Sequence, residues 1–388
     1  MKRIAVAGST GSIGRQTLDI ISERPDLYQV SVLGAGHNVD ALVEQCRRFR
    51  PAMAVIADES LYCKLKDAVA PLGIEAAAGA APLADAMERP DVDTVVTATV
   101  GYSGMEPTLR AVKAGKEIAL ANKETLVVAG ELVKRLLAQS KSKILPVDSE
   151  HSAIYQCLAG ENPESVYKLI ITASGGPFRT LTSEQLRAVT VQQALAHPNW
   201  HMGAKITIDS ATMLNKAFEI IEARWLFDIP PERIRALVHP QSIVHSMVEF
   251  VDGAVKAQLG VPDMHLPISY ALGEAHRMPS SRAGLELEDI VTLTFEEPDL
   301  ERFPCLGFAA ETLRRGGTAA CAVNAANEVA NLAFRQGRIR FTDIHPIISE
   351  TMERAPFVAK PEYEDYVMVN AESAKIAEEL TLGLSKSL

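Results

Sequence analysis

The chain reads Gly8-Ser9-Thr10-Gly11-Ser12-Ile13-Gly14 directly after a short apolar run, Arg3 to Gly8, and just before a helical pattern at Thr17 to Ser22. Glycines at such a strand-to-helix turn let the backbone approach a pyrophosphate closely, and the positive end of the helix favours its charge. The spacing is G-x-x-G-x-x-G rather than G-x-G-x-x-G, so an ordinary glycine-rich turn is the alternative. We therefore expect an α/β domain that binds a dinucleotide.

Strand-like and helix-like segments alternate through the first third of the chain, which is typical of a parallel sheet with helices on both faces. The expected strands are Arg3 to Gly8, Gln29 to Leu33, Met53 to Ala57, Thr94 to Ala98, Ile118 to Ala121 and Ile144 to Val147. The expected helices are Thr17 to Ser22, Ala41 to Phe49, Pro107 to Ala114 and Thr125 to Leu137. This pattern predicts a doubly wound, Rossmann-like domain over residues 1–147.

The pattern changes after this domain. Strand candidates follow at Lys168 to Ser174, Ala236 to His239, Ser246 to Val251 and Ala254 to Leu259, with Asp252-Gly253 as a hairpin turn. They predict a central α+β catalytic and metal-binding domain at 148–273, followed by a linker at 274–299. Helical patterns at Phe308 to Arg315, Thr318 to Arg335, Ile347 to Arg354 and Glu372 to Leu382 predict a C-terminal helical bundle at 300–388.

Composition narrows the class of protein. The chain has 388 residues, of which 47% are hydrophobic and 23% charged, as in globular proteins. Its net charge of −10 provides no general basic surface for nucleic acid, so we expect no nucleic-acid partner. The five cysteines are unclustered, and no apolar stretch approaches the length of a membrane span. We expect a soluble protein of the cytoplasm with no membrane partner.

The end of the second strand bears on the choice of dinucleotide. NAD sites usually place an acidic residue there to bind the ribose hydroxyls. Here the chain reads Gly34-Ala35-Gly36-His37-Asn38, with no carboxylate. His37 and Asn38 are able to hydrogen-bond a ribose phosphate that an acid would repel, which favours NADP over NAD.

Two carboxylates follow a later strand, in Pro146-Val147-Asp148-Ser149-Glu150-His151. If this segment is extended, Asp148 and Glu150 point to the same face with Cα atoms ~7 Å apart. Like charges aimed together repel unless a cation or a shared proton lies between them, and hard oxygen ligands suit Mg²⁺ or Mn²⁺. The alternative is a solvated strand end.

A third acid lies in the stretch Asp209 to Glu219. We expect Asp209 or Ser210 to cap a helix on which Asn215 and Glu219 share one face at i and i+4, with Lys216 one position round. A cation, an amide, a hydroxyl and an acid together match an anionic substrate bound beside a metal. An exposed polar helix face is the alternative.

Three further polar segments have two readings each. Trp200 lies in a loop, His197 to Gly203, and is either a lid over substrate or a buried anchor. Ser242 and His245 lie near a strand start, where a lone histidine is more often structural. Lys123, in Ala121-Asn122-Lys123-Glu124, either faces substrate or simply begins a helix.

In their order along the chain, these segments resemble the 1-deoxy-D-xylulose 5-phosphate reductoisomerase family. Further segments that fit are Ser174 to Phe178, Asn324-Ala325-Ala326-Asn327-Glu328 and Arg340 to Ile344. The resemblance implies a homodimer with an NADPH domain, a catalytic domain and a C-terminal helical domain. It also implies rearrangement of the ketose phosphate to an aldehyde by a retro-aldol/aldol route, and NADPH reduction to 2-C-methyl-D-erythritol 4-phosphate in the non-mevalonate isoprenoid pathway.

The resemblance also implies roles for individual residues. Positions of the NADPH site are Thr10, Gly11, Ser12, Ile13, Gly36, His37, Asn38, Asn122, Glu124 and Gly203. Positions of the divalent metal, Mg²⁺, Mn²⁺ or Co²⁺, are Asp148, Glu150 and Glu219. Positions of the substrate and its phosphate are Lys123, Ser149, Glu150, Ser174, His197, Trp200, Met202, Ser210, Asn215, Lys216, Glu219, Ser242 and His245. The catalytic set is Lys123, Asp148, Glu150 and Glu219.

Two other functions explain fewer of these residues. A plain NADP-dependent dehydrogenase of a small phosphorylated aldehyde or hydroxy acid leaves the three carboxylates beside Lys216 unexplained. A catalytically silent nucleotide sensor has no need of those acids.

Overall fold

The computed structural model describes residues 1–200 and 202–385, so His201 of the expected lid loop lies outside it, and the side chains of Asp289 and Ser385 are not described either. The chain forms two compact units. The first comprises 1–125, 133–152 and 263–282, and the second comprises 126–132, 153–262 and 283–388. Within the described part of the chain, no helix is both long enough and apolar enough to cross a membrane.

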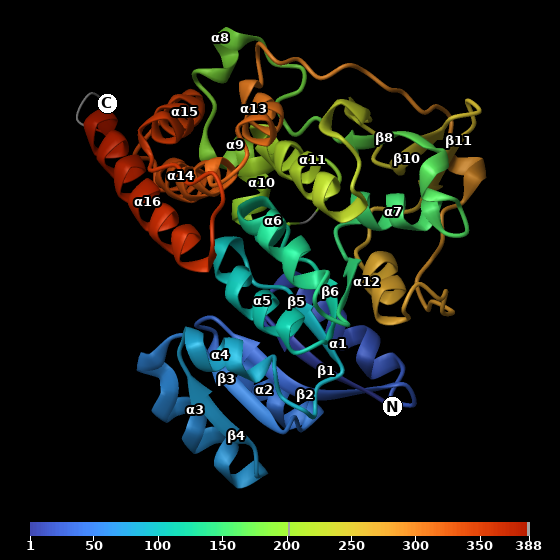
Figure 1. Cartoon of the computed structure of the whole chain (residues 1–388), viewed down its shortest axis with the longest axis vertical. Helices are drawn as coiled ribbons and strands as arrows, with labels where there is room; N and C mark the ends of the chain where they lie inside the picture. Colours follow the sequence, from blue (N-terminus) through green and yellow to red (C-terminus); the bar gives the residue numbers. More distant parts are fainter. Residues whose placement is uncertain (201, 386–388) are drawn as a thin grey trace. The chain divides into compact units, whose positions relative to one another are not determined.

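The first unit contains a seven-stranded parallel sheet in the order β4-β3-β2-β1-β5-β6-β7. Its strands are β1 (Lys2–Ala7), β2 (Tyr28–Ala35), β3 (Met53–Ile56), β4 (Glu75–Ala78), β5 (Thr94–Thr97), β6 (Glu117–Leu120) and β7 (Lys143–Pro146). The helices are α1 (Ser12–Glu23), α2 (Val39–Phe49), α3 (Tyr62–Val69), α4 (Ala80–Ala86), α5 (Met105–Lys113) and the first and last turns of α6 (Glu124–Leu137). The expected doubly wound domain is confirmed (Figure 1), while β4, α3 and α4 were not anticipated.

The strand order reverses beside β1, because β1 pairs with β2 on one side and β5 on the other. Ligands of such folds bind outside the carboxyl ends of the strands at this point. The glycine-rich turn leaves β1 there. Gly8 has φ +93°, and a Cβ on it would lie 2.4 Å from the Ala98 carbonyl oxygen. Only glycine therefore lets the turn pass this close to the end of β5.

Helix α12 (His265–Leu272) contacts α1, β6 and β7 and belongs to the first unit. The chain after it stays there: Lys2 pairs with Glu274, and the Tyr28 hydroxyl lies 3.3 Å from the Met278 sulfur. The domain limits predicted from the sequence, 148–273 for the central domain, include this helix in that domain instead. Its apolar side chains, with Ile268 and Leu272 buried, explain the difference, because composition does not tell which sheet a buried helix covers.

The second unit contains a four-stranded mixed sheet in the order β11-β10-β8-β9. The strands are β8 (Val166–Ala173), β9 (Ile234–Val238), β10 (Val244–Phe250) and β11 (Val255–Leu259). The hairpin predicted at Asp252-Gly253 is confirmed: β10 and β11 are antiparallel, and Gly253 has φ +85°. The end of the expected linker reaches this sheet, where Glu296 forms an antiparallel bridge with Val238 of β9.

The remaining helices of the second unit pack in two apolar clusters. These helices are α7 (Ser149–Leu158, whose first residues lie in the first unit), α8 (Ser183–Leu186), α9 (Val191–Leu195), α10 (Ala204–Ala211), α11 (Leu214–Phe227), α13 (Phe308–Arg315), α14 (Ala319–Arg335), α15 (Ile344–Arg354) and α16 (Tyr363–Ser385). Helix α7 packs with β8, β9 and β10 in one cluster, and helices α8 to α16 except α12 contribute to the other. Phe218 of α11, Phe308 of α13 and Ile348 of α15 lie in the same cluster of buried residues. The predicted C-terminal helices are present, with α14, α15 and α16 in mutual contact (Figure 1), but they are continuous with the core around α10 and α11.

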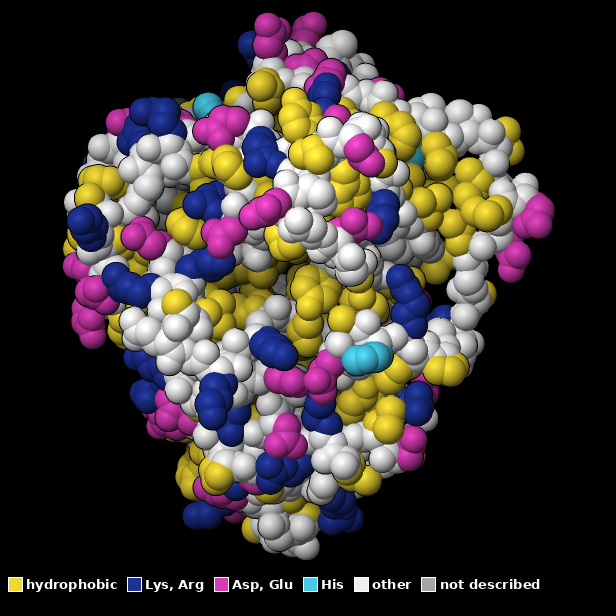
Figure 2. Space-filling model, turned by 45° about the vertical axis from the view of Figure 1, so that its right-hand side comes forward, with side chains coloured by type: hydrophobic (Ala, Val, Ile, Leu, Met, Phe, Trp, Pro, Cys, Tyr) yellow, Lys and Arg dark blue, Asp and Glu magenta, His cyan; other side chains and the backbone are white. Residues whose placement is uncertain are grey.

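Acidic and basic side chains are interspersed on the face shown in Figure 2.

Candidate active site

The glycine-rich turn meets the requirements of a pyrophosphate site. Thr10, Gly11, Ser12 and Ile13 lie at the start of α1, and each is exposed or partly exposed. No side chain caps this helix, so its first N–H groups remain directed at the turn. A Cβ on Gly8 would lie 2.8 Å from the Thr99 backbone nitrogen, and the Thr99 hydroxyl is buried and has no hydrogen-bond partner among the described residues. A bound group with acceptor atoms would satisfy these donors.

The end of β2 presents the three residues expected to select the dinucleotide. Gly36, His37 and Asn38 are exposed, and a Cβ on Gly36 would meet nothing within 4 Å. The Asn38 side-chain oxygen Oδ1 accepts a hydrogen bond from the Ala41 N–H at 3.2 Å and caps α2. The Asn38 amide N–H₂ therefore faces away from that bond and is oriented by the cap.

Asn122 differs from the expectation for a ligand-facing amide. Its side chain is buried and donates to the carbonyl oxygens of Thr99 and Gly101, both at 2.9 Å, while its oxygen accepts from the Thr125 hydroxyl at 2.6 Å. These bonds hold the segment after β5 against the start of α6. Its expected cofactor role stays a prediction, and the contacts seen are with protein. Glu124, the first residue of α6, is also buried.

Asp148, Ser149 and Glu150 lie at the carboxyl edge of the first sheet. The prediction that this segment is extended is wrong. Strand β7 ends at Pro146 and α7 begins at Ser149. The Asp148 carboxylate accepts from the Glu150 backbone N–H at 3.3 Å, as a residue preceding a helix does. This local capping bond outweighs strand continuation, so Glu150 projects from a first helical turn.

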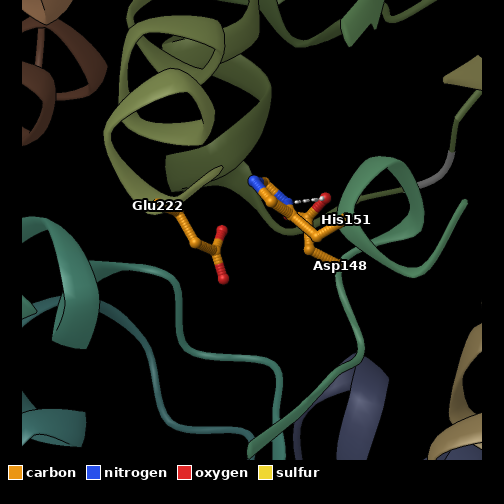
Figure 3. Close-up of side chains that lie close together, drawn as sticks. All are labelled: Asp148, His151 and Glu222. Atoms are coloured by element: carbon orange, nitrogen blue, oxygen red, sulfur yellow. Dashed lines mark ion pairs between the residues drawn. The ribbon is translucent and has the colours of Figure 1, made fainter. Parts of the chain in front are cut away.

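Asp148 is held in its charged form. It is paired with Lys123, and the His151 ring nitrogen Nδ1 lies 3.4 Å from its carboxylate (Figure 3). Burial opposes ionisation, but the Lys123 ammonium and the His151 ring more than offset it and hold the pKa of Asp148 well below its usual range. A carboxylate must be deprotonated to bind a metal, so Asp148 is suited to that role. Glu222, also drawn in Figure 3, is a buried residue of α11 in the second unit.

In the second unit, α11 presents the expected polar face. Asn215 donates to the Glu219 carboxylate one turn on, and Lys216 pairs with the same carboxylate. The expectation that Asp209 or Ser210 begins this helix is wrong. Both lie near the end of α10, and the chain turns at Met213, which has φ +64°. The Thr212 hydroxyl accepts from the Leu214 N–H at 3.3 Å, so Thr212 provides the side-chain bond at the new helix start.

Ser174 and His197 form a hydrogen-bonded pair at the end of β8. The His197 Nδ1 accepts from the N–H groups of Asn199 and Trp200 at 3.2 and 3.0 Å. The proton therefore lies on Nε2, which donates to the Ser174 hydroxyl at 2.9 Å. That oxygen also accepts from the Gly176 N–H at 3.1 Å. With two donors on its oxygen, the Ser174 hydroxyl hydrogen points elsewhere and suits an anionic acceptor.

The expected lid loop contacts the segment before β10. Asn199, which the sequence did not single out, donates to the Pro240 carbonyl at 2.6 Å and the Ser242 hydroxyl at 2.9 Å. The rings of Trp200 and His245 lie 5.9 Å apart between centroids. Met202 is partly buried and Gly203 is exposed just before α10. A Pro-Asn pair in a loop is the only sequence signal for Asn199.

Comparison with known proteins gives a consistent result along the chain. Models of the 1-deoxy-D-xylulose 5-phosphate reductoisomerase, its C-terminal domain and a further DXP reductoisomerase C-terminal domain match residues 4–130, 144–227 and 259–376. A curated reductoisomerase of Bacteroides fragilis is 55% identical over 98% of both chains.

The chain belongs to the 1-deoxy-D-xylulose 5-phosphate reductoisomerase family.

Solved structures of the reductoisomerase family agree in fold. The reductoisomerase of Zymomonas mobilis in complex with NADPH has a TM-score of 0.91 at 44% identity, covering 98% of this chain and 99% of its own. A reductoisomerase in complex with NADPH, fosmidomycin and magnesium has a TM-score of 0.91 at 38% identity, covering 100% of this chain and 98% of its own. The family and fold expected from the sequence are therefore confirmed, while the roles of individual residues stay predictions.

Proposed function

We propose that this protein catalyses the NADPH-dependent rearrangement and reduction of 1-deoxy-D-xylulose 5-phosphate to 2-C-methyl-D-erythritol 4-phosphate in the non-mevalonate isoprenoid pathway. The observation that carries the proposal is the 55% identity to a curated reductoisomerase over 98% of both chains. The donor sets described above agree in kind with such a reaction, since they include acids for a metal, donors for a phosphate and a dinucleotide turn.

The dinucleotide is NADPH, which supplies a hydride to the aldehyde carbon when bound. Thr10, Gly11, Ser12 and Ile13 hold its pyrophosphate through the start of α1. His37 and the oriented amide of Asn38 bind the 2′-phosphate beside Gly36, and the absence of a carboxylate there removes a repulsive charge. Asn122, Glu124 and Gly203 complete the set, with Asn122 acting by holding the segment Thr99–Gly101 in place.

The metal ligands are Asp148, Glu150 and Glu219. All are carboxylates, and hard oxygen donors suit Mg²⁺, Mn²⁺ or Co²⁺. The low pKa of Asp148 fits this assignment, because the group needs no deprotonation to bind a cation. When bound, such a cation polarises the carbonyl and hydroxyl oxygens of the substrate and stabilises negative charge that develops on them.

The substrate phosphate is bound by Ser174, Ser210, Asn215 and Lys216. The Ser174 hydroxyl hydrogen is directed outward by its two donors, and Lys216 contributes the charge. Lys123, Ser149, His197, Ser242 and His245 contact the carbon skeleton and its hydroxyl groups. Trp200 and Met202 cover the bound substrate and exclude water, which protects the aldehyde from hydration.

The quaternary state and compartment follow from the same resemblance. We place the protein in the cytoplasm as a homodimer. Support for the compartment comes from its cysteines, all of which are free thiols, with four of the five buried. Light scattering of the purified protein measures its mass in solution and tests the dimer.

The decisive experiment follows NADPH absorbance and the carbon connectivity of the product. We expect oxidation of NADPH with 1-deoxy-D-xylulose 5-phosphate, loss of activity with EDTA and recovery with Mg²⁺. Carbon NMR should show a quaternary carbon bearing a methyl group, which a plain dehydrogenase does not form. A straight-chain product, or oxidation unaffected by EDTA, would contradict the proposal.

A further inference from the structure

A buried carboxylate in α10 is bound by two amides of α14. The Asn327 side chain donates to Asp209 Oδ1 at 2.9 Å, and the Asn331 side chain donates to the same oxygen at 2.8 Å. Asp209 is only 2% exposed, and Asn327 and Asn331 are 1% and 0% exposed. Asn327 belongs to the Asn324–Glu328 segment, which the proposed function does not use. The proposed function therefore does not explain the contact of this segment with Asp209.

The charge of Asp209 is compensated inside the second unit. Lys205 Nζ lies 2.9 Å from Asp209 Oδ2, and the same ammonium lies 5.4 Å from the centre of the Phe218 ring. A buried carboxylate is costly unless charged or polar donors surround it, and here one ammonium and two amides do so. Such a carboxylate is confined to one position.

Both polar atoms of the Asn331 side-chain amide form hydrogen bonds. Its amide N–H₂ donates to the Lys205 carbonyl at 2.9 Å as well as to Asp209, and its oxygen accepts from Arg335 at 2.8 Å. A network in which each member is satisfied fixes the relative position of its elements. Helix α14 thus holds the backbone of α10 at Lys205 and its side chain at Asp209.

Ser210 directly follows Asp209, so its position depends on this anchor. The Asp209 carbonyl accepts from the Thr212 hydroxyl at 3.1 Å, which ties the turn after α10 to the same residue. A Cβ on Gly176 would lie 2.9 Å from the Ser210 carbonyl oxygen, so the loop after Ser174 packs directly on Ser210. A shift of α10 would move Ser210 against that loop.

We propose that Asn327 and Asn331 are positioning residues for the substrate phosphate: by holding Asp209, they set Ser210 beside the Ser174 loop. The proposal rests on the proposed function, in which Ser174 and Ser210 bind the phosphate. It gives the C-terminal Asn324–Glu328 segment a part in substrate affinity, although neither asparagine touches substrate.

The test compares Asn327→Ala with Asn324→Ala in the full-length protein with NADPH and Mg²⁺. Asn324 is equally buried on the same helix, but its amide donates to Glu328 at 3.0 Å rather than to Asp209. The probe is inorganic phosphate, measured as an inhibitor competing with 1-deoxy-D-xylulose 5-phosphate. We expect Asn327→Ala to raise the phosphate inhibition constant and the substrate KM about tenfold, equivalent to about 1.4 kcal/mol. NADPH affinity should be unchanged, and Asn324→Ala should leave phosphate inhibition near that of the wild type.

Melting temperatures separate positioning from general loss of stability. Equal increases of the phosphate inhibition constant in Asn327→Ala and Asn324→Ala, or no increase in Asn327→Ala, would overturn the proposal. If Asn327→Ala fails to fold, two other variants are judged by the same criterion. Asn327→Ser removes the Asn327 amide with a smaller change of volume, and Asn331→Ala removes the other amide bound to Asp209. Failure of the wild type to turn over substrate would contradict the proposed function instead.

Discussion

Lys216 and Glu219 form an ion pair one turn apart on α11, and their side chains are only 4% and 1% exposed. One residue is the proposed phosphate cation and the other a proposed metal ligand. Each side chain therefore neutralises the charge of the other while neither ligand is bound. A phosphate that approaches Lys216 competes with Glu219, and a cation that approaches Glu219 competes with Lys216. Metal and phosphate should consequently help each other to bind.

The first prediction concerns this coupling. Mg²⁺ should strengthen inhibition by inorganic phosphate about fivefold or more in the wild type, within the usual range of coupling between sites. Glu219→Gln removes the competing carboxylate from Lys216, so phosphate affinity should no longer depend on Mg²⁺, while turnover falls sharply. Titrations of phosphate at several Mg²⁺ concentrations measure both. The same Mg²⁺ dependence in wild type and variant would contradict the coupling.

The second prediction concerns the buried pair of Lys123 and Asp148, whose side chains are 6% and 9% exposed. Asp148→Asn removes one carboxylate of a buried ion pair, which should lower the free energy of unfolding by about 3–5 kcal/mol. Adding Lys123→Met should restore most of that loss, although neither protein should turn over substrate. Denaturant unfolding of both variants measures the difference. A double variant no more stable than the single one would show that the pair is not the cause.

The third prediction concerns acid pH and His197. Burial lowers the pKa of this imidazole, so the folded protein binds its proton less readily than the unfolded chain does. The stability that this histidine contributes is complete above its unfolded pKa of about 6.5 and is lost as pH falls toward the lowered folded value. His197→Asn keeps an acceptor for the N–H groups of Asn199 and Trp200 but does not titrate. Melting temperatures of the wild type should therefore fall more steeply below neutral pH than those of the variant, and parallel curves would contradict this.

The fourth prediction concerns cofactor choice. His37→Glu places a carboxylate where the 2′-phosphate of NADPH is proposed to lie, which should lower the ratio of kcat/KM for NADPH over NADH by about tenfold to a hundredfold. His276→Glu makes the same charge change at another exposed histidine of the first unit and is the control. An equal change of the ratio in both variants would mean that net charge, rather than His37, governs the preference.

The fifth prediction concerns the lid loop. Trp200→Ala should raise the substrate KM about tenfold, because an aromatic side chain buries a large apolar area over the ligand. NADPH affinity should stay unchanged, since the Trp200 ring lies near His245, a residue of the proposed substrate set. Trp225→Phe, at the other tryptophan, controls for loss of packing. Normal turnover with a lowered melting temperature in Trp200→Ala would identify Trp200 as a buried anchor.

Local patterns predicted several elements correctly because neighbouring residues decide them. The glycines of the first turn, the hairpin at Asp252-Gly253 and the helix expected at Thr318 to Arg335 all appear within a residue or two of their predicted places. In each case the decisive feature is backbone conformation or helical periodicity, which the sequence carries directly.

Local patterns failed where two local preferences compete. Asp148 follows a strand, but aspartate also favours the position before a helix. The second preference prevails, because the Asp148 carboxylate accepts from the Glu150 N–H at the start of α7. Near Asp209 and Ser210 the sequence offers several capping residues, so the site of the break between α10 and α11 is not evident from spacing. The left-handed Met213 at that break has no sequence signal, since methionine rarely adopts positive φ.

By itself, the sequence determined the parallel, doubly wound class of the first sheet, the dinucleotide turn, the family and the identity of the acids and donors proposed for the site. The order of the strands, including the unpredicted β4, came from the tertiary structure. The tertiary structure also decided which of the proposed acids and donors are already engaged with one another. Asp209 and Asn327 are 118 residues apart, and Asp209 and Asn331 are 122 apart, yet they share one buried hydrogen-bond network. These hydrogen bonds stabilise the protein strongly only when packing of distant helices buries them. A local sequence pattern therefore does not predict the network.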